Sequence, residues 1–123
     1  MLVKDSDMCK CLEQQKKARI ISRKFDDLLR PFGLTNGQFS IIMVIHENKT
    51  TTISNLSKKL DIDRSTLSTN IRRLETKNIL NITKNSSDSR LKTISLNESG
   101  NYLFRQCRNV WCDFMNDINT NSS

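Results

Sequence analysis

The chain has 123 residues, 36% of them hydrophobic, which is enough for one domain with one modest core. Its 20 Lys and Arg residues outnumber 13 Asp and Glu residues, and neither a membrane-spanning apolar run nor a secretory signal is present, so we expect a basic cytoplasmic protein without a membrane partner. One Pro, three Gly and one His argue against a glycine-rich phosphate loop, a turn-dense β-sandwich and histidine-based catalysis.

The positive charge is concentrated in the middle of the chain. Residues 49–92 hold ten bases and four acids, a net charge of +6, whereas residues 1–48 have a net charge of +2 and residues 93–123 a net charge of −1. A basic block between nearly neutral ends favours contact with nucleic acid. The alternative is a solvated surface that is merely basic.

The first predicted helix spans residues 7–30, where apolar residues recur at helical spacing until Pro31. Thr35 and Gln38 then have the spacing of a capping box, which predicts the start of a second helix. Residues 39–45 are apolar on every side of this helix. We therefore expect the second helix to be the buried centre of the domain.

Two short helices joined by a tight connection follow. Thr52 can cap a helix that carries apolar residues on one side, and residues 61–63 form the joint. Asp63 can then cap a second helix. Two helices of this size, separated by about three residues, indicate a helix-turn-helix, although other helical hairpins have a similar pattern.

The outward face of the second of these helices carries hydroxyl and guanidinium groups. With its apolar residues turned inward, a rotation of 100° per residue directs Ser65, Thr69, Arg72 and Thr76 outward, and Glu75 is the only acid of the helix. Arg can donate two hydrogen bonds to guanine, and Ser and Thr reach phosphates or base edges. We interpret this helix as a recognition helix, the alternative being an ordinary solvated face. Its predicted DNA-binding residues are Arg64, Ser65, Thr66, Thr69, Arg72 and Arg73.

After this helix the apolar spacing becomes strand-like. Residues 79–84 and 91–96 are predicted to form a β-hairpin around the polar turn 85–90, and a hairpin attached to a helix-turn-helix is a wing. Its tip would place Arg90 in a minor groove, with Asp88 holding the guanidinium in position. The alternative is a surface hairpin with an incidental ion pair. The predicted DNA-binding residues of the wing are Lys84, Asp88, Arg90 and Lys92.

The chain resembles the MarR-type winged-helix transcription regulators over residues 15–105. The matching motifs are Gly33-Leu34-Thr35, Gln38-Phe39, Asp63-Arg64-Ser65-Thr66-Leu67, Arg73-Leu74-Glu75, Asp88-Ser89-Arg90 and Leu96-Asn97-Glu98-Ser99-Gly100. The resemblance implies a mainly α single domain, residues 1–123, with a small β-hairpin wing. Within it, residues 33–97 would form the winged helix-turn-helix and residues 1–32 and 98–123 the dimerisation helices.

The resemblance also implies a partner and a mode of action. Members of the family are homodimers on a pseudo-palindromic double-stranded DNA operator, most often repressors that a small-molecule effector or an oxidant releases. An effector pocket would lie between the dimerisation helices and the winged domain. Phe25, Met43 and Trp111 could line it, although each also fits an ordinary core. Members usually continue past the point where this chain stops, with a further helix that completes the dimer.

The C-terminal segment carries its own signal for dimerisation. From residue 103 its apolar residues span an arc of about 140° on a helical wheel, which is broad for a helix lying on a small domain. We interpret this as a helix that packs on its own subunit with one edge and on a symmetric partner with the other. The alternative is a wide core-facing stripe. The predicted dimerisation residues are Leu103, Phe104, Cys107, Val110, Trp111, Phe114 and Met115.

The four cysteines lie near the two ends of the chain, at Cys9, Cys11, Cys107 and Cys112. A reducing cytoplasm argues against structural disulfides. We expect Cys107 to be a buried hydrophobe and Cys112 to be more exposed. If the first and last helices pack together in the dimer, as the resemblance implies, the thiols could sense an oxidant or bind a thiophilic metal. The alternative is four unrelated thiols, because this spacing is not that of a zinc site.

Two other functional classes compete with DNA binding. An enzyme is disfavoured because the chain has no Ser-His-acid set, no paired carboxylates in an apolar run and no phosphate-binding glycine motif, so we expect no catalytic residue and no cofactor. A winged helix that binds protein should have apolar residues on the recognition face, which is polar here. The sequence therefore predicts a sequence-specific DNA-binding transcription regulator.

Overall fold

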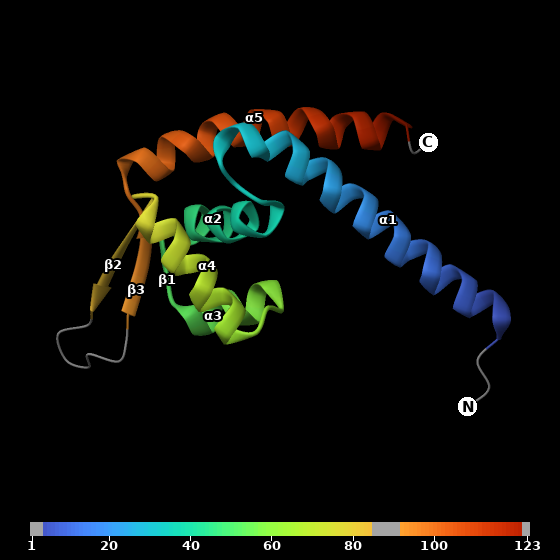
Figure 1. The fold of residues 1–123 in the computed structure, drawn as a ribbon, viewed down its shortest axis with the longest axis horizontal. Helices are drawn as coiled ribbons and strands as arrows, with labels where there is room; N and C mark the ends of the chain where they lie inside the picture. Colours follow the sequence, from blue (N-terminus) through green and yellow to red (C-terminus); the bar gives the residue numbers. More distant parts are fainter. Residues whose placement is uncertain (1–3, 85–91, 122–123) are drawn as a thin grey trace. The chain divides into compact units, whose positions relative to one another are not determined.

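The computed structural model describes residues 4–84 and 92–121, with side chains described as far as residue 118 (Figure 1). The chain divides into two compact units, Met1–Asn36 and Gly37–Ser123. Within the described residues, no helix combines the length and the hydropathy that a membrane span requires.

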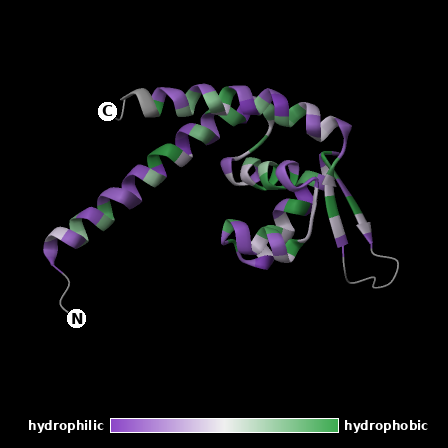
Figure 2. Ribbon diagram, turned by 180° about the vertical axis from the view of Figure 1, so that it is seen from behind, coloured by the Kyte–Doolittle hydropathy of each residue, from purple (hydrophilic) through white to green (hydrophobic). Residues whose placement is uncertain are grey.

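The first unit consists mainly of helix α1, Asp5–Leu29, which confirms the predicted first helix. Asp5 and Asp7 lie in its first turn, where negative charge complements the helix dipole. Residues 4–19 are exposed and mostly hydrophilic (Figure 2), whereas Phe25 and Leu29 near the C-terminal end are buried. The N-terminal part of the helix is therefore exposed, and its C-terminal part carries the buried side chains.

The connection out of α1 is set by backbone geometry and by one carboxylate. Pro31 begins the short 3-10 helix η1, Arg30–Phe32, and Gly33 follows in the left-handed conformation with φ of 75°. The Asp26 Oδ1 atom then accepts a hydrogen bond of 2.6 Å from the backbone N–H of Asn36, the first residue of the next helix. A side chain of α1 thus satisfies a free N–H group at the next helix start.

Helix α2, Asn36–Asn48, is the most buried element of the described residues. Its buried apolar residues lie on several sides of the helix, as the sequence predicted. They are Phe39, Ile41, Ile42, Val44 and Ile45. The core of the second unit is thus built around this helix.

Helices α3, Ile53–Leu60, and α4, Arg64–Thr76, form the predicted helix-turn-helix. The Thr52 hydroxyl caps α3 by accepting a hydrogen bond of 3.2 Å from Asn55 N. Asp61 ends α3 in the left-handed conformation, with φ of 52°. This turn redirects the chain so that α4 begins three residues later. The residues that these helices bury are Leu56, Leu67, Ile71 and Leu74.

The wing strands β2, Leu80–Lys84, and β3, Lys92–Leu96, pair antiparallel as predicted, from Leu80↔Leu96 to Lys84↔Lys92. The sheet has one more strand than the predicted hairpin. Strand β1, Thr50–Thr51, pairs with the other edge of β3 and gives the order β1-β3-β2. The predicted hairpin is therefore present, and β1 is an additional strand that the sequence analysis did not predict.

Helix α5, Glu98–Asn121, begins directly after β3 and is held against the junction between α4 and β2. The Asn97 backbone N–H donates a hydrogen bond of 3.1 Å to the Ile79 carbonyl oxygen. The Asn97 side-chain amide donates one of 2.7 Å to the Asn78 carbonyl oxygen and accepts one of 2.8 Å from Gly100 N. Asn97 therefore fixes the start of α5 against residues 78 and 79, between α4 and β2.

Candidate nucleic-acid interface

The N-terminal end of α4 is organised by the carboxylate of Asp63. Asp63 Oδ2 accepts hydrogen bonds from Ser65 Oγ at 2.7 Å and from Thr66 N at 3.0 Å, and Oδ1 accepts one from Thr66 Oγ1 at 2.7 Å. The hydrogen bond from the Thr66 hydroxyl, followed by that from the Ser65 hydroxyl, lowers the pKa of Asp63 from 3.8 to about 2. The predicted cap is therefore present and carries a full negative charge at neutral pH.

Two further hydroxyl side chains of α4, those of Thr69 and Thr76, lie along the helix and are bonded to its backbone. Thr69 Oγ1 donates to the Ser65 carbonyl oxygen at 3.0 Å, and Thr76 Oγ1 donates to the Arg72 carbonyl oxygen at 2.9 Å. Both threonines are exposed, as predicted for this face. The backbone bonds hold these side chains close to the helix surface.

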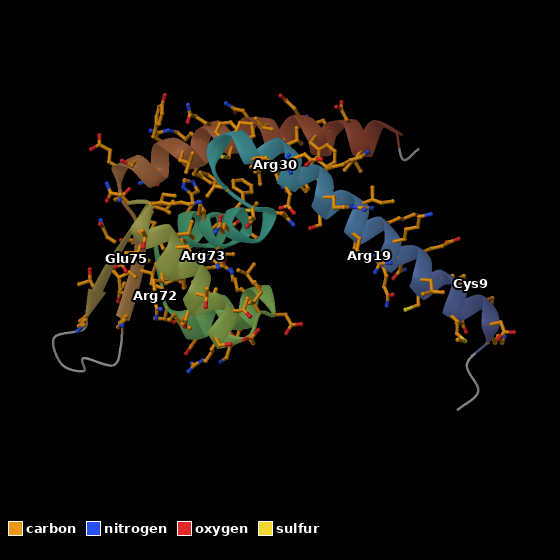
Figure 3. All side chains as sticks on the ribbon, viewed as in Figure 1. Cys9, Arg19, Arg30, Arg72, Arg73 and Glu75 are labelled. Atoms are coloured by element: carbon orange, nitrogen blue, oxygen red, sulfur yellow. The ribbon has the colours of Figure 1, made fainter. Side chains whose placement is uncertain are left out.

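The arginines of α4 differ in their surroundings. The guanidinium of Arg64 donates a hydrogen bond to Ser54 Oγ of α3, so part of its donor capacity serves the helix-turn-helix itself. The side chains of Arg72 and Arg73, labelled in Figure 3, are exposed, and neither guanidinium makes a hydrogen bond or ion pair with the part of the chain that the structure describes. Their guanidinium groups are therefore available to an external acceptor.

Arg72 lies on the side of α4 that faces the wing. There it lines a cavity of about 180 Å³ between the helix-turn-helix and the strands. This groove brings Arg72 of α4 and Lys92 of β3 together, and Glu75 lies there as well. The full lining is Ile53, Ser68, Ile71, Arg72, Glu75, Ile82, Lys92 and Ile94.

The two lysines of the wing stand opposite each other. Lys84 of β2 and Lys92 of β3 are Cα partners in the strand register, and both are exposed. Like charges at directly opposite positions destabilise a strand pair, unless an anion lies between them. This end of the sheet is thus suited to a phosphate group. Asp88 and Arg90, the predicted wing tip, lie outside the described residues.

The predicted dimerisation residues of α5 fall into two groups. Phe104 and Cys107 are already buried in the single chain, which places them on the edge that packs within the subunit. The other five are half-buried, and they are Leu103, Val110, Trp111, Phe114 and Met115. The wide apolar arc is therefore only partly covered by the described residues.

The four cysteines are free thiols in unequal environments. Cys9 and Cys11 are exposed, Cys112 is half-buried, and Cys107 is buried as predicted. Burial raises the pKa of the Cys107 thiol from 9.0 to about 11, so this thiol stays protonated and unreactive. In residues 4–84 and 92–121, no three His, Cys, Asp or Glu side chains gather where they could hold a metal ion.

A second cavity, of about 380 Å³, lies between α2 and α5. Its walls include Met43 and Trp111, which the sequence named as candidate pocket residues. Sequence reasoning missed its polar rim, although Arg108 follows Phe104 by one helical turn and so shares its side of α5. The His46 ring stacks on Phe104 with 4.0 Å between the ring centroids. The lining residues are Phe39, Met43, His46, Glu47, Phe104, Arg108, Trp111 and Cys112.

This fold, with its polar α4 face and its strand pair, defines a winged helix-turn-helix protein. Residues 34–92 match the model of the MarR family. The chain is 28% identical over 120 residues to the HTH-type transcriptional regulator SarZ of Staphylococcus epidermidis, a match that covers 96% of this chain and 78% of the relative.

Two solved structures are similar in fold. The M. tuberculosis transcriptional regulator MOSR, in complex with DNA, has a TM-score of 0.78 and 27% identity, covering 89% of this chain and 80% of that one. Wild-type MarR of E. coli has a TM-score of 0.76 and 22% identity, covering 98% and 86%. The chain is therefore similar to MarR-family winged-helix proteins, and the relatives named here are transcription regulators.

Proposed function

We propose that the protein is a sequence-specific DNA-binding transcription regulator that acts as a homodimeric repressor in the bacterial cytoplasm. The observation that carries the proposal is the exposed face of α4, on which the guanidinium groups of Arg72 and Arg73 have no hydrogen-bond or ion-pair partner within the described residues. Guanine presents two acceptors that match a guanidinium, and phosphates accept from the same groups. The solved complex of MOSR with DNA, a structure of similar fold, supports DNA as the partner.

The decisive experiment is selection of bound DNA from a random-sequence pool. We expect an inverted repeat whose half-sites lie about one helical turn apart, because two symmetric recognition helices enter successive major grooves. The Arg72→Ala/Arg73→Ala variant should lose operator affinity by more than tenfold while keeping its fold. Lys17→Ala/Lys24→Ala, which removes two exposed bases from the side of α1 away from Met8, is the matched control. A winged helix that binds protein would select no DNA sequence.

The homodimer is supported by apolar surface that the described chain leaves open. On α1, Met8 is 56% exposed and Leu12 is 62% exposed, one helical turn apart. On α5 a half-buried apolar edge continues to Met115. Burial of such surface against a second copy would stabilise both helices. A monomeric mass at micromolar concentration, together with undiminished operator affinity, would contradict the dimer.

Release by a small-molecule effector is supported by the cavity between α2 and α5. Its apolar wall and its polar rim, with Arg108 and His46, suit a small molecule that has an apolar body and one polar group. Filling the cavity by Met43→Trp should abolish ligand-induced increases in melting temperature and ligand-induced release from the operator. Equal release of both proteins would place the effector elsewhere.

Oxidation or metal binding at thiols is the alternative signal. Cys9 and Cys11 are the favoured site because they are exposed, whereas Cys107 is buried. Mild peroxide or zinc should then reduce operator binding of the wild-type protein more than that of Cys9→Ser/Cys11→Ser. Identical responses of the two proteins would leave the small-molecule signal as the proposal.

A further inference from the structure

Four hydroxyl groups on the exposed face of α4 donate their hydrogen bonds to acceptors inside the protein. Ser65 and Thr66 donate to the Asp63 carboxylate, and Thr69 and Thr76 donate to backbone carbonyl oxygens. A carboxylate and a carbonyl oxygen can only accept, so the direction of each of these bonds is fixed. A hydroxyl has one proton and two lone pairs, and each of these four side chains therefore offers only lone pairs to an external partner.

The two hydroxyls at the N-terminal end are held more firmly than the other two. Their acceptor is an ionised carboxylate, and such charge-assisted hydrogen bonds are roughly twice as strong as bonds between neutral groups. Both bonds measure 2.7 Å, which is shorter than the bonds of 3.0 Å and 2.9 Å that Thr69 and Thr76 donate to backbone carbonyl oxygens. The carboxylate stays ionised at any pH at which duplex DNA is studied, since its pKa is about 2. Turning either proton outward would break a strong bond.

We propose that Asp63 is a positioning residue that fixes Ser65 and Thr66 as hydrogen-bond acceptors, so that this end of α4 reads an exocyclic amino group of adenine or cytosine. The inference rests on the proposed DNA-binding function and adds the base chemistry of the half-site. In the major groove only adenine N6 and cytosine N4 carry donors, whereas guanine O6, thymine O4 and the phosphates are acceptors. Two hydroxyls that have no proton left to donate can accept a hydrogen bond from these amino groups, but they cannot donate one to the acceptor atoms.

Further along α4 the exposed side chains are hydrogen-bond donors instead of acceptors. Arg72 and Arg73 hold only donors, and they lie two turns further along α4. The half-site should therefore have an amino-bearing base opposite the Asp63 end and guanine or phosphates opposite the arginines.

The first test uses wild-type protein and chemically altered operators. Selection with Ser65→Ala and with Thr66→Val identifies the base pair that the hydroxyls read, because preference at that position becomes flat. Replacing adenine there by purine, or cytosine by zebularine, deletes only the amino group. We expect affinity to fall about tenfold, as for loss of one good base contact. Unchanged affinity, or selection of guanine or thymine by these hydroxyls, would overturn the proposal.

The second test changes a hydroxyl from a hydrogen-bond acceptor towards DNA into a donor. In Asp63→Asn the amide oxygen still caps Thr66 N, and Asn is as good a cap as Asp, so the helix should stay folded. The amide nitrogen is a donor, which forces a hydroxyl to accept from it and to turn its proton outward. Preference at the identified base pair should shift towards guanine or thymine.

Asp61→Asn is the matched control for this variant. It removes the same charge two residues earlier, at a left-handed position that Asn tolerates, and it should keep the wild-type preference. An Asp63→Asn protein that is folded and keeps wild-type preference at every position would refute the positioning role. If wild-type protein selects no DNA at all, the proposed function itself fails.

Discussion

Replacing Gly100 by alanine tests how closely α5 is fixed on the winged unit. Gly100 lies buried in the first turn of α5. A Cβ atom there would lie 2.3 Å from the Ile79 carbonyl oxygen and 3.1 Å from Ile79 Cγ2. Real Cβ atoms essentially never come within 3.0 Å of such atoms, so the first turn of α5 would have to move away. That movement would stretch the hydrogen bond from Asn97 N to the Ile79 carbonyl oxygen.

The expected cost follows from these contacts. Overpacking costs about 1–3 kcal/mol, and loss of one backbone hydrogen bond adds about 0.5–1.5 kcal/mol. The better helix propensity of alanine offsets about 1 kcal/mol of this. The net loss in the free energy of unfolding is then about 0.5–3.5 kcal/mol, which lowers the melting temperature of a chain of this size by about 2–14 °C. The direction of the change is informative, because a Gly→Ala substitution at a solvent-exposed helix position raises the free energy of unfolding.

Urea unfolding followed by the fluorescence of Trp111, the single tryptophan, measures this loss. Wild-type and variant proteins must be compared at one protein concentration, since the stability of an oligomer depends on it. Ser99→Ala is the matched control, because it changes an exposed residue of the same turn. A Gly100→Ala protein at least as stable as wild type would refute the close approach of α5 to Ile79.

Three further outcomes are expected. Lys84→Glu replaces a like-charged pair with an ion pair to Lys92, so it should raise the free energy of unfolding by about 0.5–1 kcal/mol. The same change should weaken DNA binding and make its affinity less dependent on salt, and an unchanged salt dependence would exclude a phosphate contact. The raised pKa of Cys107 predicts stability that is constant below pH 9 and falls as pH rises towards 11, because the unfolded thiol ionises first, and Cys107→Ala should lack this fall in urea titrations. The lowered pKa of Asp63 predicts a contribution that is fully present above about pH 4 and is lost as pH falls towards 2, and Asp63→Asn should not show that loss.

The helices could be predicted from the sequence because their determinants are local. Thr52 and Asp63 bond to N–H groups three residues away, and the apolar spacing of α4 needs no partner to be recognised. The exposed face of α4 followed from the same spacing. The DNA-reading candidates of this helix were therefore within reach of sequence reasoning.

Strand β1 was missed because nothing local marks it. It has two residues, too few to show a strand period, and it exists through pairing of Thr50 with Ser95 and of Thr51 with Ile94. Thr51 is buried, and its hydroxyl accepts a hydrogen bond of 2.7 Å from the Asn55 side chain. Only the return of β3, more than forty residues later, creates this edge.

The same contrast separates DNA reading from its regulation. The groups proposed to read DNA are set by bonds within α4 and its cap, so a sequence window of a dozen residues specifies them. The cavity rim of His46 and Arg108 forms only when two helices distant in sequence pack together. Such surfaces can change without disturbing the recognition helix. A relative that is 28% identical can therefore share the winged fold while responding to a different signal, and the effector must be sought at the packed helices rather than inferred from the recognition face.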